Sequence, residues 1–168
     1  MARQLHFPGK YYRAINGDGT TRDGFRNHTG ISESNAAPDW DPNPTIDCGR
    51  GIHVVEGHPL FVHEFALRRV DPIYYEVTCD PNPPVASSSG RKYRCLSARN
   101  VRIITDDSPE FAPELLAAIA EEDSDRDVRR ATVNKLNPEN EKHAKLLAVI
   151  AKENSDCHIR MVAARKLR

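Results

Sequence analysis

The sequence predicts an α+β protein in which a small β-rich part, residues 1–105, precedes about four helices in residues 106–168. Three observations carry this prediction. All nine glycines and nine of the twelve prolines lie at or before residue 90, and ten of the eleven aromatic residues lie before residue 94. Beyond residue 109 the chain is rich in Ala, Leu, Glu, Lys and Arg, which favour helices. This second part also contains a stretch of sequence that occurs twice.

Four segments of the first part are predicted strands, because they are rich in aromatic and β-branched residues and are bounded by turn residues. In chain order they are residues 11–15, 51–55, 73–79 and 100–104. Residues 16–20 form a loop after the first strand, and residues 29–47 form a long irregular excursion that contains Trp40. Loops of this length inside a domain often bind ligands.

The second part contains two copies of one unit. Residues 115–136 match residues 146–167 at a constant offset of 31, with 11 of 22 positions identical. Repeats with periods of 20–50 residues indicate stacked supersecondary units. Each copy is predicted to form two helices. In the first copy the inward-facing residues are predicted to be Leu115, Leu116, Ile119 and Ala120, then Val128, Ala131 or Thr132, and Leu136.

Helix-capping residues mark where these helices begin. Ser108 is predicted to cap a helix that starts at Pro109, which places the boundary between the two parts near residue 105. Asp125 and Asp156 occupy the N-cap of the second helix in each copy.

The pattern Asp-x-x-Val/Ile-Arg-x-x-Ala-x-x-x-Leu in these copies resembles that of HEAT-like helical repeats, over about 60 residues. The resemblance implies a surface for packing and binding, and implies no chemistry. Two units are fewer than the three that a free-standing solenoid usually needs. The helices are therefore expected to pack on the first part or on a second copy, and the expected partner is a protein or the same chain, bound through these helices.

Charge and composition argue against several functional classes. Lys and Arg number 24 and so do Asp and Glu, and this zero net charge argues against a protein that coats nucleic acid or an anionic membrane. No apolar run approaches the roughly 20 residues that span a bilayer, and the N-terminus lacks the apolar core of a secretory signal. We therefore expect a cytoplasmic protein with no membrane partner. The cysteines, Cys48, Cys79, Cys95 and Cys157, include no Cys-x-x-Cys pair and are expected to be reduced and unpaired.

Candidate ligand-binding residues are Arg13, His53 and Tyr75. Arg13 is a charged residue within an aromatic strand, where its guanidinium either holds a phosphate or carboxylate or faces solvent from a half-exposed strand. Cys48 and His53 come nearest to a metal site, but the usual zinc spacings are absent and no metal is predicted.

Arg91, Lys92, Tyr93 and Arg94 are the candidate nucleic-acid contacts, because basic side chains bind phosphates and an aromatic ring stacks on bases. A solvated edge strand that carries Lys and Arg has the same pattern. The zero net charge favours the edge strand.

The first part resembles two families. The Tyr-Arg strand, the Asp-Gly loop, the Trp40 excursion and the sequence Cys48-Gly49-Arg50-Gly51-Ile52-His53 look like a family of small bacterial and phage domains with a Cys-x-x-Gly-Leu/Ile-His pattern. This similarity spans about 95 residues, and that family has no established activity to transfer.

A more distant resemblance is to mono-ADP-ribosyltransferases of the cholera and pertussis toxin type. Tyr12-Arg13-Ala14 matches the strand whose arginine helps that family position NAD, and the later strands follow in the same order. Residues 85–102, where the family has its catalytic glutamate, contain no carboxylate. Only Arg13 carries over, so the catalytic residue is unknown, and an active transferase would need Glu56, Glu64 or Glu76 in that role.

These observations rank three functions. The first is a non-enzymatic binding or adaptor protein of bacterial or phage type, without a cofactor, that has a ligand pocket in the β-rich part and docks a partner on its helical repeat. The alternative is an enzyme similar to mono-ADP-ribosyltransferases, with NAD as its cofactor. The third is a protein that binds nucleic-acid backbones through the basic run at residues 91–94.

Overall fold

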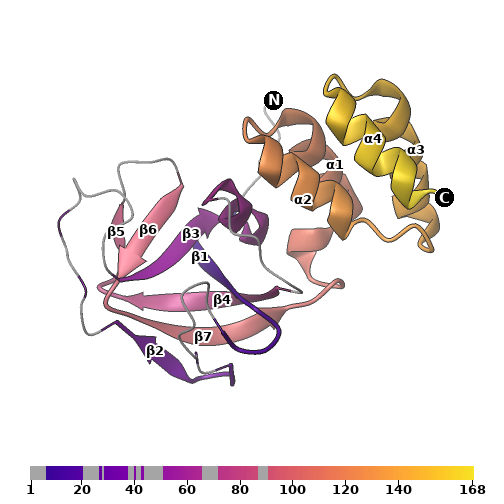
Figure 1. Cartoon of the computed structure of the whole chain (residues 1–168). Coiled ribbons are helices and arrows are strands. Elements are labelled where there is room, and N and C mark those ends of the chain that lie inside the picture. Colours follow the sequence, from indigo (N-terminus) through magenta and orange to yellow (C-terminus); the bar gives the residue numbers. More distant parts are fainter. Residues whose placement is uncertain are drawn as a thin grey trace. The chain divides into compact units, whose positions relative to one another are not determined.

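The computed structural model describes residues 7–20, 27, 29–37, 40, 43, 51–65, 72–86 and 91–168. These residues divide into two compact units. The β unit holds the described residues between 7 and 62 and between 72 and 105, and the helical unit holds residues 106–168 together with His63, Glu64 and Phe65. A sheet in one unit and helices in the other confirm the predicted α+β class (Figure 1).

The β unit is built on one antiparallel sheet. Its strands are β1 (Phe7–Ile15), β2 (Ser34–Ala36), β3 (Ile52–Gly57), β4 (Ile73–Asp80), β5 (Val85–Ala86), β6 (Lys92–Cys95) and β7 (Ser97–Ile104), and the 3-10 helix η1 (Pro59–Phe65) follows β3. Their order across the sheet is β2-β7-β4-β1-β3-β6-β5. The four predicted strands correspond to β1, β3, β4 and β7. β2 lies within the predicted irregular excursion and pairs with β7.

A bend at Leu96 shapes this sheet. β6 and β7 follow one another with only Leu96 between them, yet β6 pairs with β3 and β7 pairs with β4. The backbone N–H of Leu96 donates to the carbonyl of Asp80 at 2.8 Å. Because β1 lies between β3 and β4, this bond curls the sheet and brings the end of β4 to the end of β6.

The curled sheet buries an apolar face. Alternate side chains of a strand point to opposite faces, so paired strands contribute every second residue to the core. The buried members of this cluster are Ile15, Val54, Tyr75, Val77, Cys79, Cys95 and Ala98.

The helical unit contains a short 3-10 helix and two pairs of α-helices. They are η2 (Pro109–Phe111), α1 (Pro113–Glu122), α2 (Arg126–Lys135), α3 (Glu141–Glu153) and α4 (Cys157–Lys166). α1 packs on α2 and α3, and α4 packs on α2 and α3. The core of this unit includes Leu116, Ile119, Val128, Leu136, Leu147 and Ile159. None of the helices in the described part of the chain has the length and apolar character that crossing a membrane requires.

The predicted caps of α2 and α4 are confirmed, and that of the first helix is wrong. Asp125 Oδ1 accepts from the backbone N–H of Asp127 at 2.8 Å, and Asp156 Oδ1 accepts from that of His158 at 2.9 Å. Ser108 instead precedes η2, and its side chain makes no capping bond. An α-helix that began at Pro109 would need an N–H at residue 113, which is proline, so the helix begins at Pro113.

The inward face of the first copy agrees with the prediction apart from Leu115, which is only partly buried. Of the two alternatives in the second helix, Thr132 is buried and Ala131 is partly exposed. The Thr132 hydroxyl donates to the Val128 carbonyl at 2.8 Å, so its polar group is satisfied within the helix.

Candidate functional site

Arg13 lies in the middle of the apolar face of the curled sheet. Its register partner on β4 is Tyr75, which is part of that face. Arg13 is only 4% exposed, and its Nη2 donates to Asn27 Oδ1 at 2.7 Å. Because a buried guanidinium is costly unless it is satisfied, this bond ties Asn27 to the sheet. The guanidinium is therefore part of the interior of the β unit.

Tyr75 is the candidate ligand-binding residue that lies opposite Arg13 in the sheet. Its hydroxyl donates to the carbonyl of Thr29 at 3.1 Å. Burial raises the pKa of Tyr75, and the positive charge of Arg13 opposes this rise. The phenol is consequently neutral at physiological pH and acts as a hydrogen-bond donor.

His53 lies on the other face of the sheet. Val54, its neighbour on β3, belongs to the apolar face, so His53 points the opposite way and is exposed. Of the candidate ligand-binding residues Arg13, His53 and Tyr75, the structure therefore brings Arg13 and Tyr75 together and places His53 on the opposite face. Cys48, the other metal candidate, lies outside the described residues.

The basic run at residues 91–94 is packed into the β unit. β6 lies between β3 and β5, so the prediction of an edge strand is wrong. Lys92 and Arg94 are buried, and Arg94 Nη2 donates to the carbonyl of Asn43. The guanidinium of Arg91 lies 3.8 Å from the centre of the Phe61 ring. Two of the four candidate nucleic-acid contacts are therefore inside the fold.

Tyr93, the aromatic member of that run, is bonded to an acidic side chain. Its hydroxyl donates to Glu56 Oε2 at 2.6 Å, and this bond, with burial, raises the pKa of Tyr93 to about 12. The other oxygen of Glu56 accepts from the backbone N–H of Gly9 at 3.0 Å. Glu56 is thus held in place by two donors.

The other two acid candidates lie elsewhere. Glu76 pairs with Tyr12 in the β1–β4 register, on the face opposite to Arg13. Its carboxylate bonds Arg102 Nε at 2.7 Å and Lys10 Nζ at 3.3 Å. Glu64 lies on η1. Of the three candidates, only Glu56 is on a strand position that faces the Arg13 side.

The two helical copies repeat their turn geometry as well as their sequence. Arg129 Nη1 donates to the carbonyls of Asp123 and Ser124 at 2.7 and 3.2 Å. Arg160, at the equivalent position of the second copy, donates from its Nη1 to the carbonyls of Asn154 and Ser155 at 2.7 and 3.3 Å. The same local bonds therefore orient both arginines.

Polar contacts between described residues join the second copy to the first. Arg129 Nη2 donates to Asp156 Oδ2 at 2.9 Å, and Asn154 Nδ2 donates to the carbonyl of Ala120 at 3.1 Å. Lys166 Nζ donates to the carbonyl of Asn134. These bonds join α1 and α2 of the first copy to α4 and to the turn between α3 and α4 in the second.

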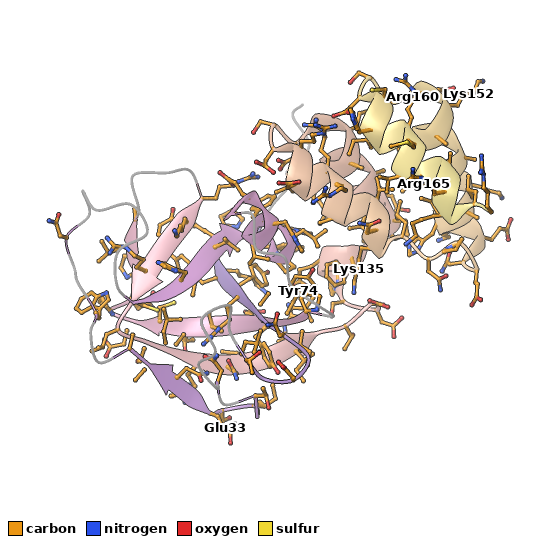
Figure 2. The ribbon with its side chains drawn as sticks, in the orientation of Figure 1. Glu33, Tyr74, Lys135, Lys152, Arg160 and Arg165 are labelled. Atoms are coloured by element: carbon orange, nitrogen blue, oxygen red, sulfur yellow. The ribbon has the colours of Figure 1, made fainter. Side chains whose placement is uncertain are left out.

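The second copy exposes side chains whose equivalents in the first copy are buried. Ala118 is 3% exposed and its equivalent Val149 is 52% exposed, whereas Leu136 is 0% and Leu167 is 42% exposed. We call Val149, Arg160 and Leu167 the open face. Figure 2 labels Lys152 on α3 and Arg160 and Arg165 on α4. No carboxylate in the described part of the chain forms an ion pair with Arg160, unlike Arg129.

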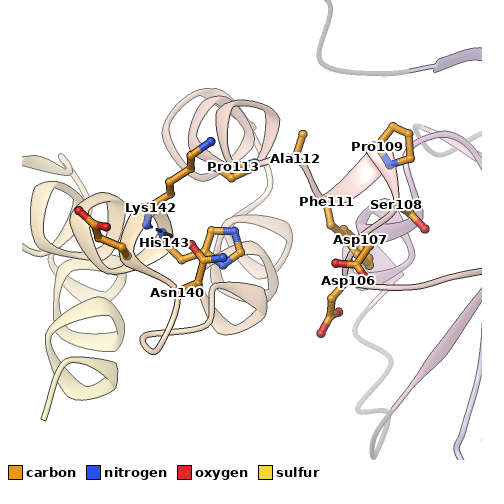
Figure 3. A pocket seen from close by; sticks show the side chains of 11 residues that line it. Asp106, Asp107, Ser108, Pro109, Phe111, Ala112, Pro113, Asn140, Lys142 and His143 are labelled. Atoms are coloured by element: carbon orange, nitrogen blue, oxygen red, sulfur yellow. Dashed lines mark hydrogen bonds between the residues drawn. The ribbon is translucent and has the colours of Figure 1, made fainter.

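An open hollow of about 590 Å³ lies in the helical unit, between residues 106–113 and the start of α3 (Figure 3). Asn140 and His143, two of its polar lining residues, are engaged in local hydrogen bonds. Asn140 Oδ1 caps α3 by accepting from the N–H groups of Lys142 and His143, and His143 Nδ1 accepts from the N–H of Asn137 at 3.1 Å.

Asp156, Cys157 and His158 form a group of possible metal ligands that the sequence did not predict, because their consecutive positions match none of the usual zinc spacings. Their possible ligand atoms lie within 4.8 Å of one another. The carboxylate of Asp156 is engaged by Arg129 and by the helix N–H, and Arg126 Nε lies 3.6 Å away. Two guanidinium groups so close to the carboxylate oppose the binding of a cation.

In comparisons with known proteins, no protein-family model, no curated protein and no solved structure matches the chain.

Proposed function

We propose that the protein is a non-enzymatic binding protein, whose four helices are two HEAT-like repeats that dock a partner on the open face. The single observation that carries this proposal is the difference in solvent exposure between equivalent residues of the two copies. Val149 and Leu167 are exposed, whereas Ala118 and Leu136 at the same positions of the first copy are buried. Repeat units bury such residues against the next unit.

The contacts between the two copies indicate what the next unit would look like. Asp156 caps α4 and at the same time accepts from Arg129 of the preceding copy. Arg160 is held by the same local bonds as Arg129 and so presents the same donors. A partner that places a helix N-cap aspartate against Arg160 would repeat the observed bond, since a guanidinium and a carboxylate form strong charge-assisted bonds.

Charge favours an acidic partner over a neutral one. Residues 115–136 carry four basic and five acidic side chains, whereas residues 146–167 carry four basic and only two acidic ones. Lys152 replaces Glu121, and Arg165 replaces Asn134. The partner we propose is therefore a pair of helices with an aspartate at the N-cap of the second helix, on an acidic surface that also covers Val149 and Leu167.

A synthetic peptide of residues 137–167 that carries Lys152→Glu and Arg165→Asn serves as the probe, because it keeps Asp156 and the face that packs on the first copy, and these two changes give it more acidic than basic side chains. The full chain is titrated against the labelled peptide, and binding is followed by fluorescence anisotropy. We expect saturable binding that weakens at least about tenfold when Arg160→Ala is introduced in the full chain or Asp156→Asn in the peptide. Val149→Asp in the full chain should also weaken it.

The matched control is Arg130→Ala. Arg130 is an exposed arginine of the first copy, paired with Asp127 at 3.0 Å on its own helix, and its loss should leave binding unchanged. Equal binding by the Arg160→Ala and wild-type chains would contradict the proposal. So would self-association of the full chain that Val149→Asp abolishes, because the open face would then belong to a second copy.

A further inference from the structure

The interior of the β unit brings two cysteines from distant strands into contact. Cys79 is near the end of β4 and Cys95 is the last residue of β6, and β1 and β3 lie between these strands in the sheet. The bond between the Leu96 N–H and the Asp80 carbonyl closes the gap. The two side chains share a hydrogen bond and both belong to the buried cluster.

The surroundings of the pair distinguish the two thiols. The hydrogen bond from Cys79 lowers the pKa of Cys95, and the Arg13 guanidinium lowers it further, although burial acts in the opposite direction. The bond to Cys95 and burial raise the pKa of Cys79. One proton therefore leaves Cys95 more easily while Cys79 keeps its own, which is the arrangement of an attacking and a resolving thiol.

We propose that Cys79 and Cys95 are a redox modification site that a small hydroperoxide converts to an intramolecular disulfide. The Cys95 thiolate attacks the peroxide oxygen, forming sulfenic acid as hydroxide or alkoxide leaves. The Cys79 sulfur then attacks the Cys95 sulfur, the S–S bond forms, the S–O bond breaks, and the proton of Cys79 leaves with the hydroxyl as water. Two thiols are oxidised, and the peroxide is reduced to water or to water and an alcohol.

This disulfide would join strands that are not neighbours in the sheet. It would fasten the end of β4 to the corner where β6 turns into β7, next to Arg13 and Tyr75. Closing this loop, which spans residues 79–95, should raise the thermal midpoint of the β unit by roughly 10 °C.

The experiment uses the full chain and hydrogen peroxide. Reduced protein is treated with one equivalent of peroxide, unfolded, alkylated with N-ethylmaleimide and analysed by mass spectrometry after non-reducing digestion. We expect a cross-linked peptide that contains Cys79 and Cys95, two fewer alkylated thiols, and reversal by dithiothreitol. The Cys157→Ser variant is the matched control, because it removes an exposed thiol of α4 and should leave the cross-link unchanged.

Two results would overturn the proposal. One is full alkylation of Cys79 and Cys95 after peroxide treatment of the wild-type chain, which needs no variant to fold. The other is a cross-link of either residue to Cys48 or Cys157 in place of the internal pair. Cys95→Ser should abolish the cross-link, and near-ultraviolet circular dichroism of that variant checks that its β unit is folded.

Discussion

Replacing Leu136 by alanine should cost far more stability than the same change at Leu167, although the two residues occupy equivalent positions of the two copies. Leu136 is completely buried, so the change removes its full transfer free energy and leaves a cavity, which together cost about 3–5 kcal/mol. Leu167 is 42% exposed and leaves no closed cavity, so its loss should cost about 1 kcal/mol. The difference, about 2–4 kcal/mol, corresponds to a gap of roughly 10 °C or more in the thermal midpoint of a domain of this size.

Urea unfolding followed by far-ultraviolet circular dichroism measures this difference, because the helices dominate that signal. The dependence of unfolding free energy on urea should be unchanged in both variants, so that the midpoints report stability alone. Equal losses in the two variants would refute the reasoning, since they would mean that packing of the second copy on the first does not bury Leu136 more than Leu167. A larger loss at Leu167 would mean that the open face is already covered.

Three further predictions follow from individual side chains. The pKa of Asp156 is lowered, first by its bond from the backbone N–H of His158 and also by Arg129, so the folded state binds this proton more weakly than the unfolded state. Stability of the helical unit should therefore be fully present above the ordinary aspartate pKa and fall as pH drops through the lower folded value, and Asp156→Asn should flatten this part of the acid unfolding profile. Tyr93 should ionise near pH 12, so spectrophotometric titration of Tyr93→Phe should lack one late tyrosinate step, and the stability from its bond to Glu56 should be lost between about pH 10 and 12. Millimolar NAD should leave the thermal midpoint unchanged, because Arg13 is buried; a midpoint that rises, and does not rise in Arg13→Lys, would instead support the transferase-like alternative.

Patterns with local causes were predictable. The caps at Asp125 and Asp156 depend only on bonds to residues close by in the chain, and both are present. The strands were predicted from β-branched and aromatic residues, and the helices from their composition and spacing. The failure at Ser108 was also local, because Pro113 removes the N–H that a helix from residue 109 requires.

Burial of charged residues was not predictable in the same way. The run at residues 91–94 has the composition of a solvated edge strand, but short β5 pairs with β6 and places it inside the sheet. Lys92 and Arg94 are also buried, and Arg94 contacts a distant segment, because its Nη2 donates to the carbonyl of Asn43. Composition indicates which residues water favours, whereas the segments that pack over each face of the sheet decide which side chains water reaches.

The sequence by itself determined the α+β class, the internal repeat and the positions of most helices and strands, because these depend on neighbours within about one turn or one strand. Only the tertiary structure decided that Arg13 faces Tyr75, that His53 faces away, and that Cys79 meets Cys95. Each of these outcomes depends on strand register and on the bend at Leu96, which join residues far apart in the chain. A shift of one position in register would turn every side chain of a strand to the other face, and no local pattern specifies that choice.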